Sequence, residues 1–252
     1  MEKHFVRFRT GPASRKMHTN MDNSSSAENV GAPQPETETR LLHEEVVDHV
    51  RDLIVQGKLA AGTKLNERVL CEQLRISRTP LREALKYLAS EGLVALLPNR
   101  GAIVAPLEPE HIRQTFVVLG ALEALAGELA CAHASDEAIR AIRGLHFQML
   151  AHHARGELAE YFRCNQEIHV KIVEAGGNEP LVQLYRGLNA HARRARYMAN
   201  LSRERWDHAV EEHESILDAL IRRDSALLPA LLRSHLENKM LVVLESLGQQ
   251  AA

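Results

Sequence analysis

The sequence has few aromatic residues, few cysteines and no hydrophobic run approaching the roughly 20 residues that a membrane-spanning helix needs. Only 4% of its 252 residues are aromatic, whereas 45% are hydrophobic and Leu, Ala, Glu and Arg are abundant, a balance typical of mainly helical proteins. The three cysteines, Cys71, Cys131 and Cys164, contain no CxxC pair, which favours reduced cytoplasmic thiols over a disulfide framework. The N-terminal MEKHFVRFRT is followed by no apolar segment and does not resemble a secretory signal.

The motifs of several enzyme classes are also missing. The chain has no HExxH, no GxSxG and no phosphate-binding GxxxxGK or GxGxxG. Di-iron bundles need paired Glu-x-x-His motifs, and the chain offers a single match, Glu108 with His111. The sequence therefore predicts a protein that is not an enzyme, with a helical metalloenzyme as the minor alternative.

The first 40 residues differ in composition from the rest. They contain TNMDNSSSAENVGAPQPETET, which has almost no large apolar residue, so burial cannot offset the entropy lost on ordering. Residues 1–40 are predicted to be a disordered tail. From Leu41 apolar residues recur at helical spacing, and the first helix is predicted to end at Gly57. LAAGTKLN then indicates a turn, whose Asn66 caps a short helix through Leu74.

The stretch ISRTPLREALKYLASEGL predicts the next helix. Ser77 is a favourable N-cap, Pro80 is tolerated only in a first helical turn, and Gly92 ends the run. Arg78 and Arg82 are four residues apart and share one face of this first turn, where the helix dipole disfavours cations. An anion from outside the chain would resolve this conflict.

The fold class follows from the order of these elements. Two short β-prone runs flank PNRG at 98–101, which has the chemistry of a hairpin turn. Three helices and a two-stranded β-wing make a winged helix-turn-helix domain, predicted for residues 41–106. Residues 108–248 show no strand signal and about six helices, broken near HASDE, ARGE, AGGNEP, ANLS and RRDS. The fold is therefore predicted to be mainly α, with an N-terminal winged helix-turn-helix and a C-terminal all-α helical bundle.

The winged helix predicts a surface that reads DNA. In a helix-turn-helix, the first residues of the second helix meet base edges in the major groove. The candidate donors to bases and phosphates there and on the adjoining basic surface are Arg68, Ser77, Arg78, Thr79, Arg82 and Arg100. The formal net charge of −2 allows only a local basic face. The alternative is that these arginines pair with neighbouring acids on a solvated helix face.

The segment from Gly57 to Val104, with its motif SRTPLREAL…EGL…NRG, closely resembles the winged-helix domain of GntR-type bacterial transcription regulators. The resemblance implies contacts with operator DNA at the following positions: Arg68, Ser77, Arg78, Thr79, Arg82 and Gly101. Arg68 and Arg78 are expected to reach bases. Gly101, which has no side chain, would let the wing approach the minor groove closely.

Three of the 14 histidines lie on stripes that are predicted to face the core: His169, His213 and His235. Asn165 lies one turn before the first of them. An unpaired polar group in a core costs about 1–3 kcal/mol, so each of these side chains needs a partner. Three imidazoles and an amide oxygen could together bind a divalent metal. Three separate core histidines, each bonded to a backbone carbonyl or water, account for the same pattern.

The C-terminal half resembles the FCD ligand-sensing domain of the FadR-like GntR subfamily. That domain has an Asp or Asn four residues before a His, and two further histidines about 22 residues apart. Here these are Asn165, His169, His213 and His235, the last two 22 apart, and EEHESILDALIRRDSALLPALLRSH matches the final segment of the family. The resemblance implies a divalent metal, zinc before nickel, iron or manganese, and a small-molecule effector such as a carboxylate.

Two positions depart from that family. Asn165 replaces the commoner aspartate, so the site loses a negative charge and is expected to hold metal less tightly. Leu119 stands where many relatives have an arginine that helps to bind a carboxylate effector, four residues before Glu123. Candidate substitutes lie in HARRARYMAN: Arg193, Arg194, Arg196 and Tyr197. Their alternative role is a solvated or dimer-facing helix surface.

Together the patterns predict a ligand-responsive, DNA-binding transcription regulator. We expect a homodimer that presents two recognition helices to double-stranded, pseudo-palindromic operator DNA, with no membrane partner. Repression that the ligand releases is the more usual behaviour of the family. A second interpretation keeps the DNA-binding domain and makes the helical half a metal-free effector or dimerisation domain.

Overall fold

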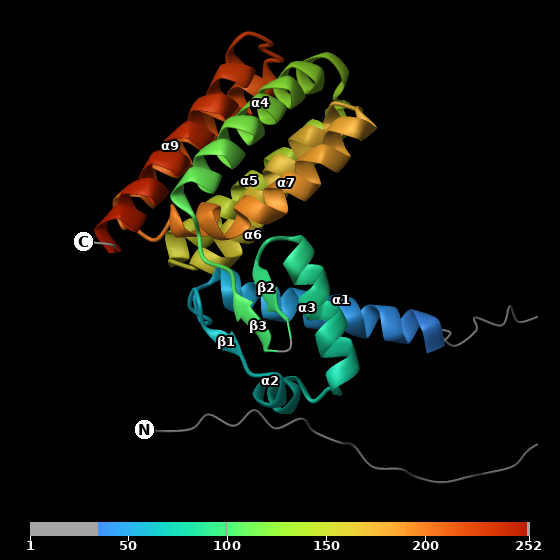
Figure 1. Cartoon of the computed structure of the whole chain (residues 1–252). Coiled ribbons are helices and arrows are strands. Elements are labelled where there is room, and N and C mark those ends of the chain that lie inside the picture. Colours follow the sequence, from blue (N-terminus) through green and yellow to red (C-terminus); the bar gives the residue numbers. More distant parts are fainter. Residues whose placement is uncertain (1–34, 99, 251–252) are drawn as a thin grey trace, which may run out of the picture.

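The computed structural model describes residues 35–98 and 100–250 (Figure 1). Most of the predicted tail, residues 1–34, lies outside the described residues. Helix α1 (Pro35–Val55) begins six residues before the expected start at Leu41. A proline suits the first position of a helix because its missing N–H would have no partner there. Residues 35–40 are therefore helical, although their composition places them with the tail.

Two short helices follow α1 in the N-terminal half. Helix α2 (Glu67–Leu74) begins after the N-cap Asn66, as the sequence predicts. The Oδ1 atom of Asn66 accepts hydrogen bonds from the backbone N–H groups of Arg68 and Val69. Helix α3 (Arg78–Ser90) begins after Ser77, but the Ser77 side chain makes no capping hydrogen bond. The predicted N-cap is thus correct in position only.

A small sheet completes the N-terminal half. Strands β2 (Val94–Leu97) and β3 (Gly101–Val104) pair antiparallel and confirm the predicted hairpin. The segment expected to be only a turn contributes a further strand, β1 (Lys64–Leu65), which pairs with β3. The sheet of the described residues therefore has three strands in the order β1-β3-β2 rather than two. Two residues are too short to show the alternation that marks a strand in a sequence.

The C-terminal half consists of six helices in the part of the chain that the structure describes, as predicted. They are α4 (Pro109–His133), α5 (Asp136–Arg155), α6 (Leu158–Ala175), α7 (Glu179–Met198), α8 (Arg203–Ile221) and α9 (Leu227–Gln250). Helices α4 and α9 run side by side, and α5 packs on α6 (Figure 1). The fold is mainly α, with the two-part organisation that the sequence predicts.

Helix α4 corrects one expectation from the sequence. By length and composition it is apolar enough to cross a membrane, although no such run was expected. More than half of its most apolar window is buried, and it packs against α9, α6 and α7. These features are typical of the central helix of a bundle.

Helices α6 and α7 support the N-terminal half. Phe162 of α6 and Tyr197 of α7 belong to the hydrophobic core of that half, and their ring centroids lie 5.1 Å apart at an interplanar angle of 85°. Arg194 Nη1 donates a hydrogen bond of 2.8 Å to the carbonyl of Ala105, in the segment that connects the wing to α4. The two halves are therefore packed together, with α7 in contact with both.

The turn after α3 generates the first prediction. Gly92 has a φ of 71°, and a Cβ at this position would lie 2.2 Å from Nδ1 of His191 on α7. We expect Gly92→Ala to lower the free energy of unfolding by about 2–3 kcal/mol in urea denaturation, because backbone strain adds to the clash. Adding His191→Ala to the Gly92→Ala variant should recover only the part of the lost unfolding free energy that comes from the clash, because the backbone strain remains.

Gly187→Ala on α7 is the matched control for this prediction. Nothing lies within 4 Å of a Cβ there, so this change should be neutral or slightly stabilising. A Gly92→Ala variant as stable as the wild type would contradict the close approach of α7 to the end of α3.

Candidate functional site

The residues proposed to read DNA lie on one exposed surface of the N-terminal half. All seven are exposed: Arg68, Ser77, Arg78, Thr79, Arg82, Arg100 and Gly101. A cleft of about 460 Å³ between the start of α2, the start of α3 and the wing is lined by three of them, Arg68, Arg78 and Gly101. The fold thus brings residues from two helices and the hairpin to one concave surface.

The guanidinium groups of this surface are only weakly neutralised. Arg82 Nε donates a 2.9 Å hydrogen bond to Glu67, and Arg68 has a longer contact within α2, but the two arginine side chains remain 59% and 73% exposed. Such exposed pairs contribute only about 0–1 kcal/mol. Arg78 and Arg100 are exposed and pair with no carboxylate among the residues described. The alternative in which neighbouring acids pair with the arginines thus holds for Arg68 and Arg82, but not for Arg78 and Arg100 among the described residues.

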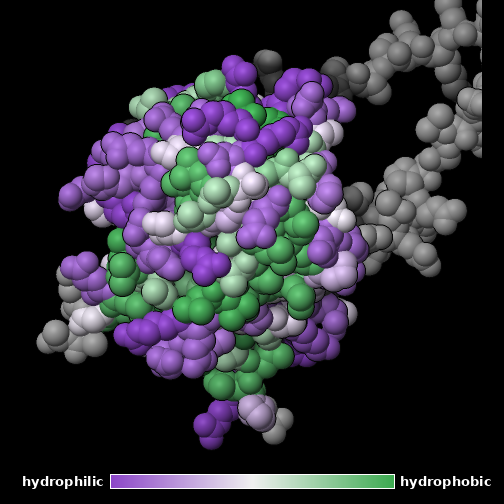
Figure 2. All heavy atoms as spheres, turned by 90° about the horizontal axis from the view of Figure 1, so that it is seen from above, coloured by the Kyte–Doolittle hydropathy of each residue, from purple (hydrophilic) through white to green (hydrophobic). Residues whose placement is uncertain are grey.

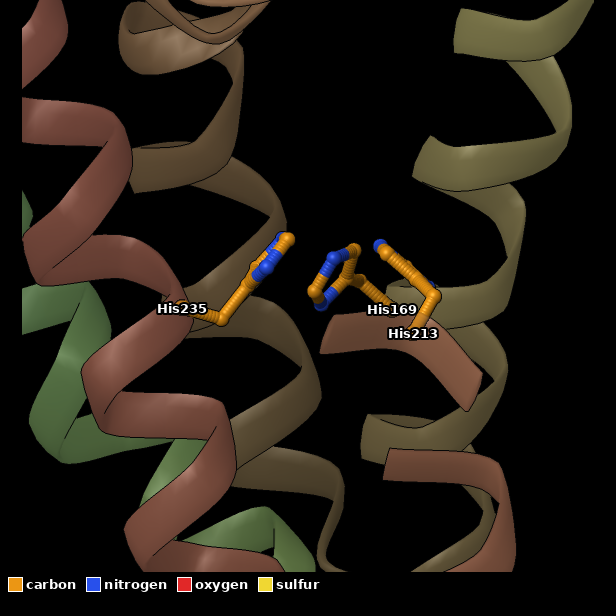
Figure 3. A group of neighbouring side chains, drawn as sticks. All are labelled: His169, His213 and His235. Atoms are coloured by element: carbon orange, nitrogen blue, oxygen red, sulfur yellow. The ribbon is translucent and has the colours of Figure 1, made fainter. Parts of the chain in front are cut away.

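A second candidate site lies inside the helical half (Figure 3). His169 of α6, His213 of α8 and His235 of α9 converge there, each only 1% exposed, with ring centroids 4.7–5.1 Å apart. One nitrogen of each ring lies within 4.8 Å of the others. The fully buried Asn165 contacts His213 Nε2 through its amide. The four residues that the sequence singles out are therefore neighbours, and the histidines are not separate core residues.

Carboxylates orient two of the three imidazoles. His169 Nδ1 lies 2.8 Å from Glu123, and His235 Nδ1 lies 2.6 Å from Glu212. A carboxylate only accepts hydrogen bonds, so each Nδ1 carries the proton and each Nε2 keeps its lone pair. Within the described residues both Nε2 atoms, and Oδ1 of Asn165, are buried without a partner. Metal-binding imidazoles have this arrangement, with the remote nitrogen donating to a carboxylate.

Burial also sets the charge of the cluster. Burial lowers the pKa of His169 to about 4, and it lowers the pKa values of His213 and His235 well below the ordinary value, with neighbouring positive groups adding to the effect. All three rings are therefore neutral at pH 7, which is the form that binds a metal. Three neutral imidazoles and an amide oxygen fit a divalent first-row metal.

Glu123 of α4 organises the polar groups around the cluster. Its carboxylate is 1% exposed and accepts hydrogen bonds from His169, from Tyr185 at 2.9 Å and from Arg196 Nη1 at 3.2 Å. Burial alone would raise the pKa of Glu123, but these neighbours lower it to about 2, so the carboxylate is ionised. Sequence reasoning missed its role, although it lies on the buried stripe of α4 at helical spacing from Leu119.

Only one of the four candidate effector residues on α7 reaches this network. Arg196 is fully buried, donates to Asn189 at 2.8 Å, and has an Nε and an Nη2 without a partner in the described part of the chain. Arg194 contacts the connecting segment, Tyr197 packs in the N-terminal core and Arg193 lines a cleft at the junction. The four residues therefore have different surroundings, because successive helical residues point about 100° apart.

Lys239 of α9 is a further buried cation that sequence reasoning missed. It follows His235 by one helical turn, on the same face, and is 0% exposed. Its Nζ lies 3.4 Å from Oδ1 of Asn200. Burial, together with the positive charges of Arg196 and Arg205, lowers its pKa to about 7. The spacing from His235 was the signal that could have found it.

These two sites define a class of protein, a winged-helix DNA-binding domain joined to a helical sensing domain. Residues 42–104 match the family described as "Bacterial regulatory proteins, gntR family", and residues 114–238 match the FCD domain. The chain therefore belongs to the GntR family of bacterial regulatory proteins and carries an FCD domain.

Individual relatives agree with this assignment. The chain is 32% identical over 186 residues to the Nta operon transcriptional regulator of Aminobacter aminovorans, which covers 73% of this chain and 86% of that protein. It is 26% identical over 206 residues to the HTH-type transcriptional repressor RspR of Escherichia coli (strain K12), a match that covers 79% of this chain and 87% of that protein. Its fold is similar to that of E. coli McbR/YncC, with a TM-score of 0.72 at 19% identity, and the match covers 84% of this chain and 99% of that one. The chain is thus a transcriptional regulator of the GntR type.

The buried histidines generate the second prediction. After treatment with a chelator, the protein should lose stability as the pH falls below about 6.5. The unfolded chain binds protons at His169, His213 and His235 near that pH, whereas the folded chain resists until the pH is far lower, about 4 for His169. The unfolded state therefore binds more protons in this window, and each histidine removes up to about 1.4 kcal/mol of unfolding free energy per pH unit.

Urea denaturation between about pH 7.5 and pH 5 measures this slope. Replacing His213 and His235 by Asn should flatten it, whereas the same change at the exposed His133 and His208 should not. Equal slopes for the wild type and the His213→Asn/His235→Asn variant would show that the cluster is not neutral in the folded protein.

Proposed function

We propose that this regulator is a ligand-responsive repressor that acts in the cytoplasm and binds operator DNA as a homodimer. The observation that carries the proposal is the convergence of three neutral histidines, His169, His213 and His235, beside the donors of Arg196 that have no partner in the described residues. Carboxylates orient two of these histidines, His169 and His235. That polar centre lies in the domain whose helix α7 also packs against the winged helix. The name of RspR as a repressor supports the sign of regulation.

In this proposal the start of α3 enters the major groove. Arg68 and Arg78 contact base edges from the cleft that they line, and Arg82 binds phosphate beside them. Ser77 and Thr79 are further donors at the helix start. Arg100 and Gly101 bring the wing to the adjacent minor groove. The exposure of all these positions supports the assignment.

Exposed apolar residues on the helical half support a homodimer. They include Val117, Val118 and Leu125 of α4 and Leu241 of the adjacent α9, which are 42–67% exposed. Figure 2 shows hydrophobic residues gathered in a band between hydrophilic margins on the face seen from above. Large apolar patches on otherwise polar surfaces commonly mark protein interfaces. A two-fold interface here would present two recognition helices to one operator.

The metal in this proposal is a divalent ion, zinc or otherwise nickel, iron or manganese, held by His169, His213, His235 and the amide oxygen of Asn165. When bound, it supplies a positive charge that attracts an oxygen of the effector. Arg196 binds the same acidic group, since its Nε and Nη2 lie buried without a partner in the described residues. The effector is accordingly a small acid.

A metalloenzyme is not favoured by the same geometry. The pKa of Glu123 is about 2, so this carboxylate is a poor general base. Glu212, beside the other imidazole, accepts hydrogen bonds from Arg205, His235 and Asn238. Both carboxylates hold neighbouring side chains in place, which suits a binding site rather than proton transfer. The metal content of the purified protein distinguishes this metal site from the alternative of a metal-free effector or dimerisation domain.

The DNA surface generates the third prediction. Arg78→Ala should weaken binding to an operator selected from random-sequence DNA by about 1–3 kcal/mol and relax the preference at one base. Arg82→Ala should weaken binding to all sequences and reduce the salt slope by about one. Gel-shift titrations across salt concentrations measure both. Lys86→Ala, at an exposed position farther along α3, is the control. If Arg78→Ala and Arg82→Ala bind the operator as tightly as Lys86→Ala does, the proposed placement of α3 in the major groove is wrong.

The histidine cluster generates the fourth prediction. Protein purified without chelator or nickel resin should contain one divalent metal per chain, and His169→Ala/His213→Ala should lose it. Native mass spectrometry and elemental analysis report the metal and the subunit number together. The exposed pair His133→Ala/His208→Ala should keep the metal. Equal metal content in both double variants would support the metal-free alternative.

A further inference from the structure

The polar centre of the helical half contains more positive charge than its own carboxylates balance. Arg196 and Lys239 are both 0% exposed, whereas Glu123 is the one fully buried carboxylate that the structure shows beside them. Arg205 and Glu212 balance each other at the edge of the centre. Among the described residues the centre thus has two fully buried basic side chains and one fully buried carboxylate.

Lys239 is the buried basic residue that has no carboxylate partner among the described residues. An ammonium group has three donors, and taking it out of water costs several kcal/mol unless an anion replaces the water. The contact that the structure gives Nζ is the 3.4 Å approach to Asn200, an uncharged amide at the long end of hydrogen-bond distance. Buried lysines without an anion are rare in cores and common at binding sites.

The nearby carboxylates are already engaged. Both oxygens of Glu123 accept from other groups, namely His169, Tyr185 and Arg196. Glu212 accepts from Arg205 through both oxygens, and from His235 and Asn238 as well. No carboxylate of the described residues is hydrogen-bonded to Lys239, so an anion from outside these residues would be the partner that holds its ammonium charged.

Lys239 belongs to the same centre as the histidines. It lies one turn after His235 on the same face of α9, and both side chains are buried in the helical half. A ligand at the histidines is thus also a neighbour of Lys239. A divalent ion in the cluster would raise the excess positive charge of the centre from one to three. A single carboxylate group of a ligand neutralises only one of these charges.

We propose that Lys239 is an effector-binding residue and that the effector carries two acidic groups. One group binds where the metal and Arg196 converge, and Lys239 binds the other. The inference rests on the proposed effector site and narrows its ligand from small acids in general to diacids. A monoacid would leave the ammonium of Lys239 buried without an anion, so its affinity is lower.

Calorimetric titration of the zinc-loaded full chain tests the inference with acids matched in carbon number. The pairs are propionate with malonate, butyrate with succinate, and pentanoate with glutarate, at pH 7. In at least one pair the diacid should bind about tenfold or more tightly than the monoacid, because it makes an additional charge-assisted contact in a buried site.

Lys239→Met should reduce that preference to less than about threefold, and Lys239→Gln is a second variant should the first fail to fold. Methionine keeps the length and apolar bulk of the side chain without its charge. A purely structural lysine would allow the same change without altering the preference between diacid and monoacid. Lys171→Met, at a partly exposed lysine that pairs with Glu174, is the matched control and should keep the preference.

Wild-type protein that binds both members of every pair equally, or binds none of them, overturns the inference. A preference that persists in Lys239→Met or Lys239→Gln also overturns it. Metal content and operator binding are measured on the same preparations, since their loss from the wild type would contradict the proposed function itself. Intact metal and operator binding without a diacid preference would contradict the role of Lys239 alone.

Discussion

The buried carboxylate of Glu123 is the constraint on which the helical domain depends. It joins three helices, because α4 supplies the carboxylate, α6 supplies His169, and α7 supplies Tyr185 and Arg196. An ionised group in a core is stable only with charged and hydrogen-bonded partners, and removing one partner of such a pair costs about 3–5 kcal/mol. The same bonds fix which nitrogen of His169 is free and hold Arg196 in the core. The geometry of the ligand site is therefore part of what holds the domain together.

Helix α7 connects the Glu123 network with the N-terminal half. Its inner face carries Tyr185, Asn189 and Arg196, which contact Glu123 or one another, whereas Arg194 and Tyr197 contact the connecting segment and the N-terminal core. A helix moves as a rigid body over such distances, so a displacement that the ligand imposes on Arg196 also displaces Tyr197. The ligand shifts the placement of the winged helix only by its differential affinity for the two arrangements. A charged ligand in a buried site is suited to this role, because its interaction energy changes steeply with small displacements.

The sequence predicted those features that depend on local patterns. Helical spacing placed His169, His213 and His235 on core-facing stripes, and turn chemistry placed the hairpin between Leu97 and Gly101. Features that depend on contacts between distant segments were missed. Glu123 and Glu212 orient imidazoles on other helices, and no spacing within one helix reveals such a pairing. The four residues of HARRARYMAN looked equivalent as a cluster, but the faces of α7 have different surroundings, and of the four only Arg196 contacts the Glu123 network.

Asn165 and Lys239 act in the same direction on the charge of the site. An aspartate at position 165 would supply a negative charge to the metal from within the chain, and a neutral residue at position 239 would remove a positive one. With Asn165 and Lys239 in place, the diacid proposed above would supply the negative charge that these two positions do not provide. The metal and the ligand then each raise the affinity of the other by the same factor, because coupling between two binding events is reciprocal. In the proposed site, the metal and the acid together, rather than either alone, would define the state that α7 conveys to the DNA-binding domain.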